Sequence, residues 1–141
     1  MKYLYMLDTN MFSFIARGTS SRSRLEFQRL SQDTQAVLCV SSIAVAEIRY
    51  GMSKHKVSPN RKSAIERLLQ QFQILTWGDD EASVYGELRA KLESRGITIQ
   101  DMDLLIAAHA VATGAVLVTH DGVFQHVDDL NATIDWATDL T

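Results

Sequence analysis

The sequence predicts an α/β protein with a mostly parallel central sheet and helices on both faces. Two observations lead to this prediction. Short apolar runs of strand length recur along the chain, at residues 2–7, 36–40 and 115–119. Between them lie longer segments whose apolar residues recur at helical spacing. Alternation of this kind places helices on both faces of a parallel sheet.

Five elements are expected in the N-terminal half. They are a strand at residues 2–7, a helix at 11–16, a helix ending at 31, a strand at 36–40 and a helix at 43–50. Thr9 and Asn10 are expected to start the first helix and Gly18 to end it, because polar side chains cap free N–H groups and glycine adopts the left-handed turn. Serines precede the next two helices, and Gly51 is expected to end the third.

Six elements are expected after the only proline, Pro59, which marks a loop or the start of a helix. They are a helix at 64–72, a strand at 74–77, a helix at 79–93, a helix at 104–112, a strand at 115–119 and a weak strand at 134–136. Gly96 and Gly114 end the two longer helices. In sheets of this type ligands bind beyond the carboxyl ends of the strands, where the strand order reverses.

Length and cysteine content narrow the class of protein. The 141 residues, 1–141, are expected to form one domain, long enough to bury a core. Cys39 is the only cysteine, so an intrachain disulfide is excluded, and its apolar setting AVLCV is typical of a buried hydrophobic residue. The N-terminus has too few apolar residues for a signal peptide, and no segment approaches transmembrane length. We therefore expect a cytoplasmic protein without membrane association.

Charge is distributed unevenly between the two halves. Residues 1–67 hold 11 Lys/Arg and 5 Asp/Glu, a net +6, whereas the remainder holds 3 and 12, a net −9. A metal site that faces a polyanion would use both halves, since carboxylates hold the metal and basic side chains hold phosphates. Solvated helix faces explain the same segregation, and from the charges alone both interpretations stay open.

Four acidic residues stand beside or within apolar sequence near expected element ends. They are Asp8 in LYMLDTN, Glu47 in SSIAVAEIRYG, Asp103 in DMDLLIAAHA and Asp121 in VLVTHDGVF. An isolated carboxylate in such a setting is costly to desolvate. Carboxylates that converge on a divalent metal remain charged, and hard oxygen ligands favour Mg²⁺ or Mn²⁺. The pattern therefore predicts a metal-dependent phosphodiesterase.

Each acid also has a purely structural interpretation. Asp8 and Asp103 both fit the start of a helix, and Asp121 fits a turn. Glu47 is flanked by apolar residues, which indicates a largely buried helix and a carboxylate in need of a partner. The coincidence of four such residues in one small domain favours a shared site.

The histidines suggest a rival zinc site. They are His55, His109, His120 and His126, and none forms a close pair with another histidine or a cysteine at metal-ligand spacing. His109 lies on an apolar helix, where a structural histidine is the expected interpretation. The chain also lacks the nucleophile elbow, the P-loop and the glycine-rich dinucleotide turn.

Five motifs taken together resemble the PIN-domain ribonucleases, specifically the VapC-like toxins of bacterial toxin–antitoxin pairs. The motifs are LDTN, SSIAVAEIRYG, DLLIAAHA, LVTHDGVF and the terminal IDW. They cover nearly the whole chain in the order and spacing of the family. The resemblance implies a compact three-layer α/β/α sandwich around a mostly parallel sheet.

The resemblance also implies a catalytic and metal-binding set: Asp8, Glu47, Asp103 and Asp121. Asp103 is preferred to Asp101 because it directly precedes the Leu-Leu-Ile-Ala-Ala block. Asp121 occupies the position that varies most among such toxins. Asn10 and Thr119 match polar residues that help to hold the site in relatives.

The activity implied is hydrolysis of an RNA phosphodiester by a metal-activated water, with Mg²⁺ as cofactor and Mn²⁺ as a substitute. Asp8 and Asp103 would be the principal ligands, and Glu47 would bind a second metal or position the water. Similar toxins cut structured RNA, often a tRNA near the anticodon, form homodimers and are silenced by a small antitoxin. Basic residues of the first half are expected to contact phosphates: Arg17, Arg22, Arg24, Arg29, Arg49 and Lys54.

Two alternatives to an RNA-cleaving enzyme remain. The first is a PIN-like module that has lost catalysis and only binds a partner. The second is a phospho-acceptor signalling domain, which needs an acidic pair after the first strand and a late lysine. Asp8 stands alone before Thr-Asn, and no lysine follows Lys91. Both features disfavour the signalling domain.

Four apolar residues follow Asp8 closely, namely Met11, Phe12, Phe14 and Ile15. About half of them are expected in the core and the rest in a groove for the antitoxin.

Overall fold

The computed structural model describes residues 2–138 and contains one parallel sheet. Its strands are β1 (Tyr3–Leu7), β2 (Ala36–Ser41), β3 (Gln73–Leu75), β4 (Val116–Val118) and β5 (Ala132–Ile134). They lie in the order β3-β2-β1-β4-β5, and each neighbouring pair is parallel. The expected parallel sheet is confirmed.

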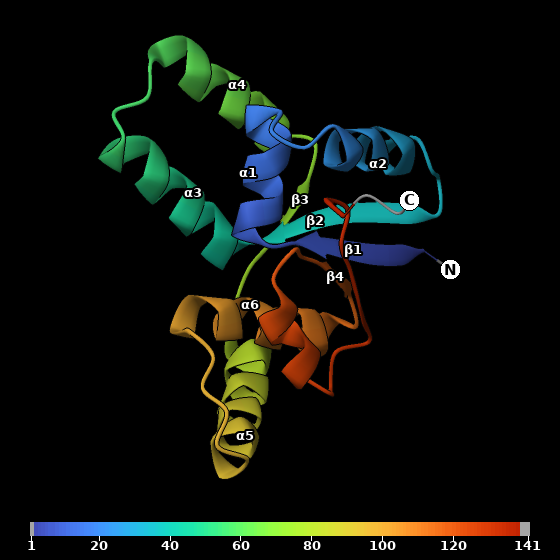
Figure 1. The fold of residues 1–141 in the computed structure, drawn as a ribbon, viewed down its shortest axis with the longest axis vertical. Coiled ribbons are helices and arrows are strands. Elements are labelled where there is room, and N and C mark those ends of the chain that lie inside the picture. Colours follow the sequence, from blue (N-terminus) through green and yellow to red (C-terminus); the bar gives the residue numbers. More distant parts are fainter. Residues whose placement is uncertain (1, 139–141) are drawn as a thin grey trace.

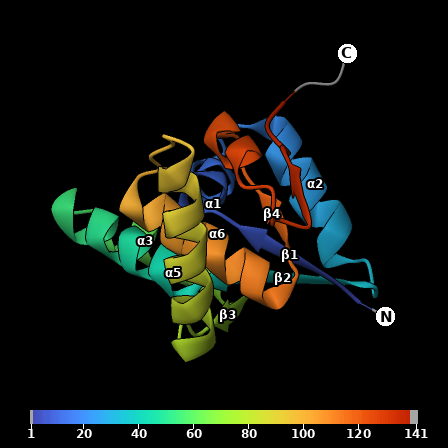
Figure 2. The ribbon, with the colours of Figure 1, turned by 90° about the horizontal axis from the view of Figure 1, so that it is seen from below.

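Six α-helices in the described part of the chain cover the two faces of this sheet. They are α1 (Thr9–Arg17), α2 (Ser21–Ser31), α3 (Ser42–Lys54), α4 (Pro59–Leu69), α5 (Asp79–Ser94) and α6 (Asp101–Thr113). Figure 1 shows α1 to α4 on one side of the sheet and α5 with α6 on the other. Figure 2 shows α5 lying across α6. The predicted three-layer α/β/α sandwich is confirmed.

The core has two halves because successive side chains of a strand point to opposite faces of the sheet. Met6 and Leu7 of β1 are both fully buried, on opposite sides. Leu7 packs under α1 to α4, and Met6 packs with Cys39 against α5 and α6. Burial raises the pKa of the Cys39 thiol to about 12, so this residue behaves as the hydrophobic core residue expected from its setting.

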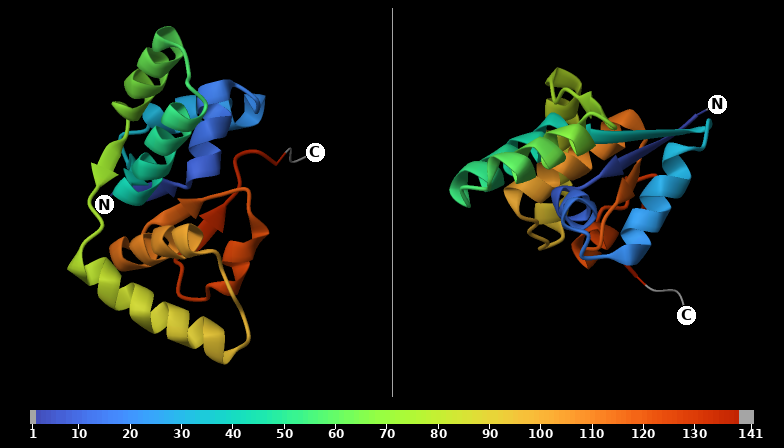
Figure 3. Two further views of the ribbon diagram at one scale, coloured as in Figure 1. Left: turned by 90° about the vertical axis from the view of Figure 1, so that its left-hand side faces the viewer. Right: turned by 90° about the horizontal axis from the view of Figure 1, so that it is seen from above.

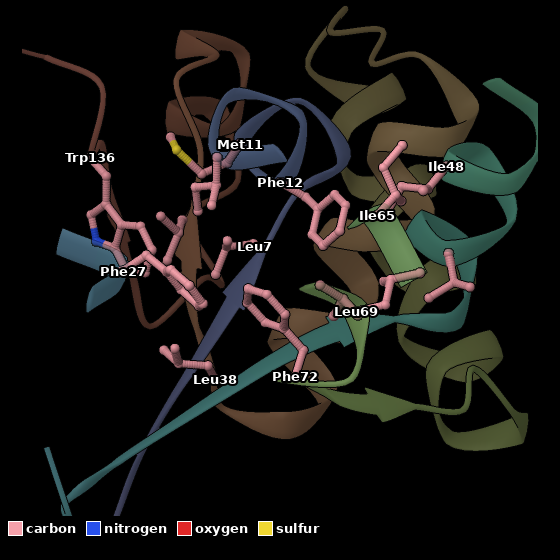
Figure 4. Close-up of a cluster of buried hydrophobic side chains, with 14 of the residues drawn as sticks. Leu7, Met11, Phe12, Phe27, Leu38, Ile48, Ile65, Leu69, Phe72 and Trp136 are labelled. Atoms are coloured by element: carbon pink, nitrogen blue, oxygen red, sulfur yellow. The ribbon is translucent and has the colours of Figure 1, made fainter. Parts of the chain in front are cut away.

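Aromatic side chains pack together in the half of the core that lies beneath α1 to α4. The rings of Phe27 and Phe72 stack with centroids 5.3 Å apart, and Phe12 meets Phe72 at 5.7 Å (Figure 4). Of the four apolar residues that follow Asp8, three are buried, namely Met11, Phe12 and Ile15. Phe14 is half-buried and meets the ring of His120 edge-on. The core therefore takes more of this segment than the expected half.

Two helix boundaries differ from the prediction for physical reasons. Helix α3 continues through Gly51 to Lys54, because Gly51 has helical rather than left-handed geometry and Ile48 and Met52 are buried on either side of it. Helix α4 begins at Pro59 rather than near residue 64. Ser58 caps it by accepting a hydrogen bond from the N–H of Arg61 at 3.2 Å.

The sheet edges and the start of α6 also differ from expectation. Strand β3 ends at Leu75, and Trp77 instead donates its backbone N–H to Ser42 and its indole N–H to the carbonyl of Leu105. Strand β5 precedes Trp136, which is buried in the core. Helix α6 begins two residues before Asp103, and a short 3₁₀ turn, η1 (Gly122–His126), follows β4. None of the helices in residues 2–138 has the length and apolar character that crossing a bilayer requires.

Candidate active site

The carboxyl ends of β1 and β4 define the position of the candidate site. The chain leaves β1 between β2 on one side and β4 on the other, so the strand order reverses here. Asp8 follows β1 directly and Thr119 follows β4 directly. Their backbones meet as well, because the N–H of Asp8 donates to the carbonyl of Val118 at 3.1 Å. Two segments 111 residues apart thus share one edge of the sheet.

Both carboxylate oxygens of Asp8 accept hydrogen bonds. One accepts from the N–H of Met11 at 2.8 Å and caps α1, and the other accepts from the hydroxyl of Thr119 at 2.6 Å. The side chain is only 4% exposed. Asp8 itself is therefore the helix cap, rather than Thr9 or Asn10, and it combines the capping interpretation with a place in the site. Asn10 is exposed on the first turn of α1.

Thr119 links Asp8 to Asp121. Its hydroxyl oxygen accepts from the backbone N–H of Asp121 at 3.0 Å while its hydroxyl proton goes to Asp8. The Asp121 carboxylate accepts from the N–H of Val123 at 3.0 Å and caps η1, and its side chain is exposed. The turn interpretation of Asp121 is thus present in the structure alongside its proximity to Asp8.

Glu47 projects from α3 towards the start of α1. Its Oε1 accepts a hydrogen bond from the hydroxyl of Thr9 at 2.6 Å. Ile48 next to it is buried but Ala46 is exposed, so α3 is half-buried rather than largely buried as expected. The sequence placed Thr9 at a helix start but did not indicate its contact with Glu47. Its only signal was a hydroxyl one residue after an aspartate at a strand end.

Asp103 and Asp101 occupy the same first turn of α6 but face different surroundings. Asp103 is half-buried, and its pKa is raised by burial, then by the charges of Asp121 and Glu47. The side chain of Asp101 is 76% exposed and lies 3.9 Å from the guanidinium of Arg89. The helix therefore separates the two acids, and only Asp103 lies within electrostatic reach of the others.

Repulsion among these carboxylates links all four. The pKa of Asp8 is raised from 3.8 to about 6, chiefly by burial. Its hydrogen bonds from Thr119 and Met11 oppose this rise, and the charges of Asp103 and Asp121 add to it. Within residues 2–138 none of the four forms an ion pair with a basic side chain. The arrangement is an acidic cluster without a compensating cation of its own.

The donor chemistry of this cluster fits a hard divalent cation. All its ligand atoms are carboxylate or hydroxyl oxygens, the type that Mg²⁺ and Mn²⁺ prefer. Within the described residues, no three His, Cys, Asp or Glu side chains already stand close enough to form a metal cage. An ion that keeps several waters and takes one or two carboxylates needs no such cage.

Two histidines have other partners. His109 of α6 is buried, with Nδ1 2.8 Å from the Ser41 hydroxyl and Nε2 3.7 Å from Glu81. Burial lowers its pKa, against the opposite effect of Glu81. His120 is exposed, with Nδ1 2.7 Å from the carboxylate of Asp135. His109 therefore joins the start of α3 to α6 and α5, the structural role expected for it.

The chain matches a known protein family over most of its length. The model of the PIN-domain family matches residues 5–130. The chain belongs to the PIN-domain family. Within it the chain groups with the VapC ribonucleases. It is 35% identical to "Ribonuclease VapC2" of Rickettsia felis, over 84% of this chain and 87% of that protein. It is 29% identical to the "tRNA(fMet)-specific endonuclease VapC" of Shigella flexneri, over 94% of this chain and 98% of that one.

Solved structures of PIN proteins share the fold. VapBC2 from Rickettsia felis, bound to a DNA fragment from its promoter, superposes with a TM-score of 0.87 at 32% identity and covers 94% of this chain and 98% of its own. DNA-bound VapBC from Salmonella typhimurium gives a TM-score of 0.85 at 27% identity, over 96% and 99%. Recognition of a VapC-like PIN protein from five sequence motifs is thus confirmed.

Proposed function

We propose that this PIN protein is a Mg²⁺-dependent endoribonuclease and the toxin of a toxin–antitoxin pair. One observation carries the proposal: four acidic side chains share one electrostatic cluster at the end of β1, with no basic partner. Such a cluster persists in a folded protein when a cation compensates for it. The family's ribonuclease members support the choice of RNA.

We assign Asp8 and Asp103 as the principal metal ligands, with Glu47 and Asp121 completing the catalytic set. Mg²⁺, or Mn²⁺ in its place, supplies a water of lowered pKa and polarises the phosphoryl oxygen when it is bound. Thr119 holds the Asp8 carboxylate at 2.6 Å, and Thr9 holds Glu47 at the same distance. These hydroxyls fix the orientation of their acids, and we assign Glu47 to position the attacking water or to hold a second ion.

We propose a structured RNA as substrate, and a tRNA cut near the anticodon as its identity. The name of the Shigella relative, which is specific for one tRNA, supports this choice. We place the reaction in the cytoplasm because its substrate is found there. Four of the six basic residues expected to contact phosphates have other partners: Arg29 with Glu26, Arg49 with Glu66, Arg24 with the carbonyl of Ile15, and Lys54 with the ring of Tyr50. Arg17 is exposed, lines the same groove as Thr9 and Glu47, and is our first choice for phosphate contact.

We propose a cognate antitoxin as the regulating partner and a homodimer as the toxin's assembly. The solved relatives are toxin–antitoxin complexes, which supports the first. A hollow between α1, α2 and α4 is lined in part by Phe27 and Leu68, and we propose that an apolar antitoxin segment binds there. The homodimer is proposed from the family resemblance, and we expect Tyr50 on α3 and Ile74 on edge strand β3, which are 65% and 47% exposed, at its interface.

Substitutions of Asp103 and Asp101, the two acids in the first turn of α6, test this proposed function. Asp103→Asn is expected to lower RNA cleavage by at least roughly a hundredfold with the fold intact, because it removes a ligand of the metal. Asp101→Asn, on the same turn but exposed, is the matched control and should retain cleavage within about twofold. EDTA should abolish wild-type cleavage, and Mg²⁺ or Mn²⁺ should restore it. Full cleavage by Asp103→Asn would refute the assignment of this residue.

The same experiment decides between the enzyme and a catalytically silent PIN module. A wild-type protein that binds its antitoxin but cuts no RNA with Mg²⁺ would be such a module. The phospho-acceptor alternative is disfavoured by the geometry of Asp8. Both its oxygens accept hydrogen bonds, and the side chain is 4% exposed, so it is poorly placed to attack a phosphoryl donor.

A further inference from the structure

A groove runs from the candidate site along the surface between α1 and α3. It begins at Thr9 and Glu47, whose side chains are joined by a 2.6 Å hydrogen bond. Helix α4 closes its far end, where Arg61 donates to the carbonyl of Ala16 at 2.9 Å. Figure 3 shows α3 and α4 as a hairpin beside α1. The groove is thus continuous with the acidic cluster but extends beyond it.

Two stripes of side chains face each other across this groove. Thr9, Ser13 and Arg17 of α1 recur every four residues and so lie on one face of that helix. Glu47 and Gly51 recur in the same way along α3, and His55 continues this spacing directly after the helix ends at Lys54. The stripes begin at Thr9 and Glu47, which a hydrogen bond joins. The walls are therefore polar and end at Arg17 and His55.

Gly51 lines this groove from α3 and contributes no side chain to it. A glycine in a helix interior is less favourable than an alanine, because glycine loses more conformational freedom on folding. Gly51 has no left-handed backbone that requires glycine, and a Cβ placed there would meet nothing within 4 Å. Neither strain nor crowding in the folded chain accounts for the missing side chain. Its absence leaves open space where the groove passes α3.

The groove combines an apolar floor with a basic surround. Ile48, Met52 and Ile65 form much of the floor, and Arg17 and Arg61 stand at its margin. Arg17 and Arg61 are the two arginines that line the groove, whereas Arg49, Lys56 and Lys62 line a separate hollow. An apolar floor with two arginines beside it suits a base attached to a charged phosphate backbone.

We propose that the α1–α3 groove is a nucleotide-binding subsite, which receives one base of single-stranded RNA next to the scissile phosphate. Arg17 and Arg61 hold a phosphate further along the same strand, and Gly51 provides the space for the base. The proposal rests on the ribonuclease function proposed above and adds to it where the substrate strand runs.

Size and distance favour this occupant. The cavity is about 190 Å³, smaller than the ~300–1,000 Å³ of pockets that enclose drug-sized ligands. It therefore suits one base rather than a whole small molecule. Arg17 lies two turns from Thr9, roughly 12 Å along the axis of α1. It is too distant to touch the phosphate at the acidic cluster and is placed for a phosphate further along the same strand.

The test measures binding of a fluorescein-labelled, single-stranded RNA decamer of mixed sequence by anisotropy, in EDTA, with full-length protein. Gly51→Leu fills the groove and is expected to raise Kd about tenfold or more, since a bound base contributes roughly tenfold to a hundredfold in affinity. Gly86→Leu is the matched control, because Gly86 is also inside a helix with nothing within 4 Å of a built Cβ. It should leave Kd unchanged.

A second pair of variants tests the phosphate contact. Arg17→Gln should flatten the dependence of log Kd on log salt by about 0.7, the value for one phosphate contact on a single strand. Arg29→Gln, on α2 and paired with Glu26, should leave the slope unchanged. Circular dichroism and thermal midpoints verify that each variant is folded. The Gly51→Ala variant should melt no lower than wild type.

The outcomes separate this proposal from the ribonuclease function. Equal Kd values for Gly51→Leu and Gly86→Leu, with unchanged salt slope in Arg17→Gln, would overturn the subsite even if wild type cleaves RNA. Cleavage is not needed for the binding measurement, so an inactive wild type would overturn only the function. If Gly51→Leu binds RNA normally but is no longer inhibited by the cognate antitoxin, the groove holds the antitoxin and the proposal is wrong.

Discussion

Asp8 combines a structural and a chemical role in one carboxylate. One oxygen caps α1 and the other accepts from Thr119, yet burial still raises its pKa to about 6. The folded state therefore binds a proton at this group more tightly than the unfolded chain, whose ordinary value is 3.8. It follows that ionised Asp8 destabilises the metal-free fold at pH 7, and that this cost disappears as the pH falls from about 6 towards 3.8.

We predict that Asp8→Asn melts at a higher temperature than wild type in EDTA at pH 7. A shift of this size corresponds to about 1–3 kcal/mol, and asparagine removes the charge while its carbonyl can still cap α1. Differential scanning fluorimetry at pH 7 and pH 5 measures the effect, which should shrink at pH 5. Asp101→Asn is the control and should not move the midpoint. A lower midpoint for Asp8→Asn at pH 7 would contradict this account.

Thr9 illustrates how a neighbouring hydroxyl positions an acid. Among residues 2–138, Thr9 alone donates a hydrogen bond to the Glu47 carboxylate, at 2.6 Å. We predict that Thr9→Val lowers kcat about tenfold with little change in KM, since a hydrogen bond to a charged group contributes about 1.5–3 kcal/mol. Steady-state cleavage kinetics measure kcat and KM separately. Thr113→Val serves as control, because that hydroxyl only bonds a helix carbonyl at the far end of α6.

At the scale of the elements, His109 joins three helices around the site. It contacts Ser41 at the start of α3 and Glu81 on α5, and it sits on α6 with Asp103. Its orientation therefore helps to fix α3, which carries Glu47, against α6. Burial lowers its pKa in the folded state, so the folded chain binds a proton here less readily than the unfolded chain does at about 6.5.

We predict that His109 makes the fold sensitive to acid. Its contribution to stability is complete above pH 6.5 and is lost as the pH falls below that value, because only the unfolded state gains the proton. His109→Asn should cost about 1–3 kcal/mol at pH 7.5 through its lost contacts, and the difference from wild type should narrow by pH 5.5. Urea titrations at the two pH values measure it. Exposed His126 provides the control: His126→Asn should match wild type at both.

At the scale of the whole molecule, the groove that starts at Glu47 adjoins the hollow between α1, α2 and α4, because Ala16 and Ile65 line both, so a single partner can contact the two. Arginine bridges carboxylates in a bidentate manner, so an antitoxin arginine would supply the cluster with positive charge in place of a metal ion. We predict that the antitoxin inhibits cleavage through its C-terminal portion, with an Arg or Lys reaching Asp8 and Asp103.

Co-purification with antitoxins truncated from the C-terminus measures this directly. Truncated forms should retain binding through the remaining segment but lose inhibition of RNA cleavage. Substituting the terminal basic residues by glutamine in the full-length antitoxin separates charge from length. Undiminished inhibition by the shortest fragment would rule out this arrangement of the pair.

The local pattern of the chain was enough to predict its layers and most of its helices. Strand runs, helix spacing and capping residues act over a few neighbours, so the ends of α1 at Gly18 and α6 at Gly114 followed from them. The pattern failed where packing outweighed propensity. Gly51 is a stop signal by composition, but buried neighbours in α3 keep it helical.

By itself, the sequence determined the fold class, the PIN family and the four candidate acids, because each is recorded in short motifs. Only the tertiary structure decided how those acids are held. The bond from Thr119 to Asp8 spans 111 residues and that from Thr9 to Glu47 spans 38, and both depend on the order of β1, β2 and β4 in the sheet. The open space beside Gly51 also belongs to the packed helices. Local rules cannot specify such contacts, since they arise when distant segments bury their apolar faces together.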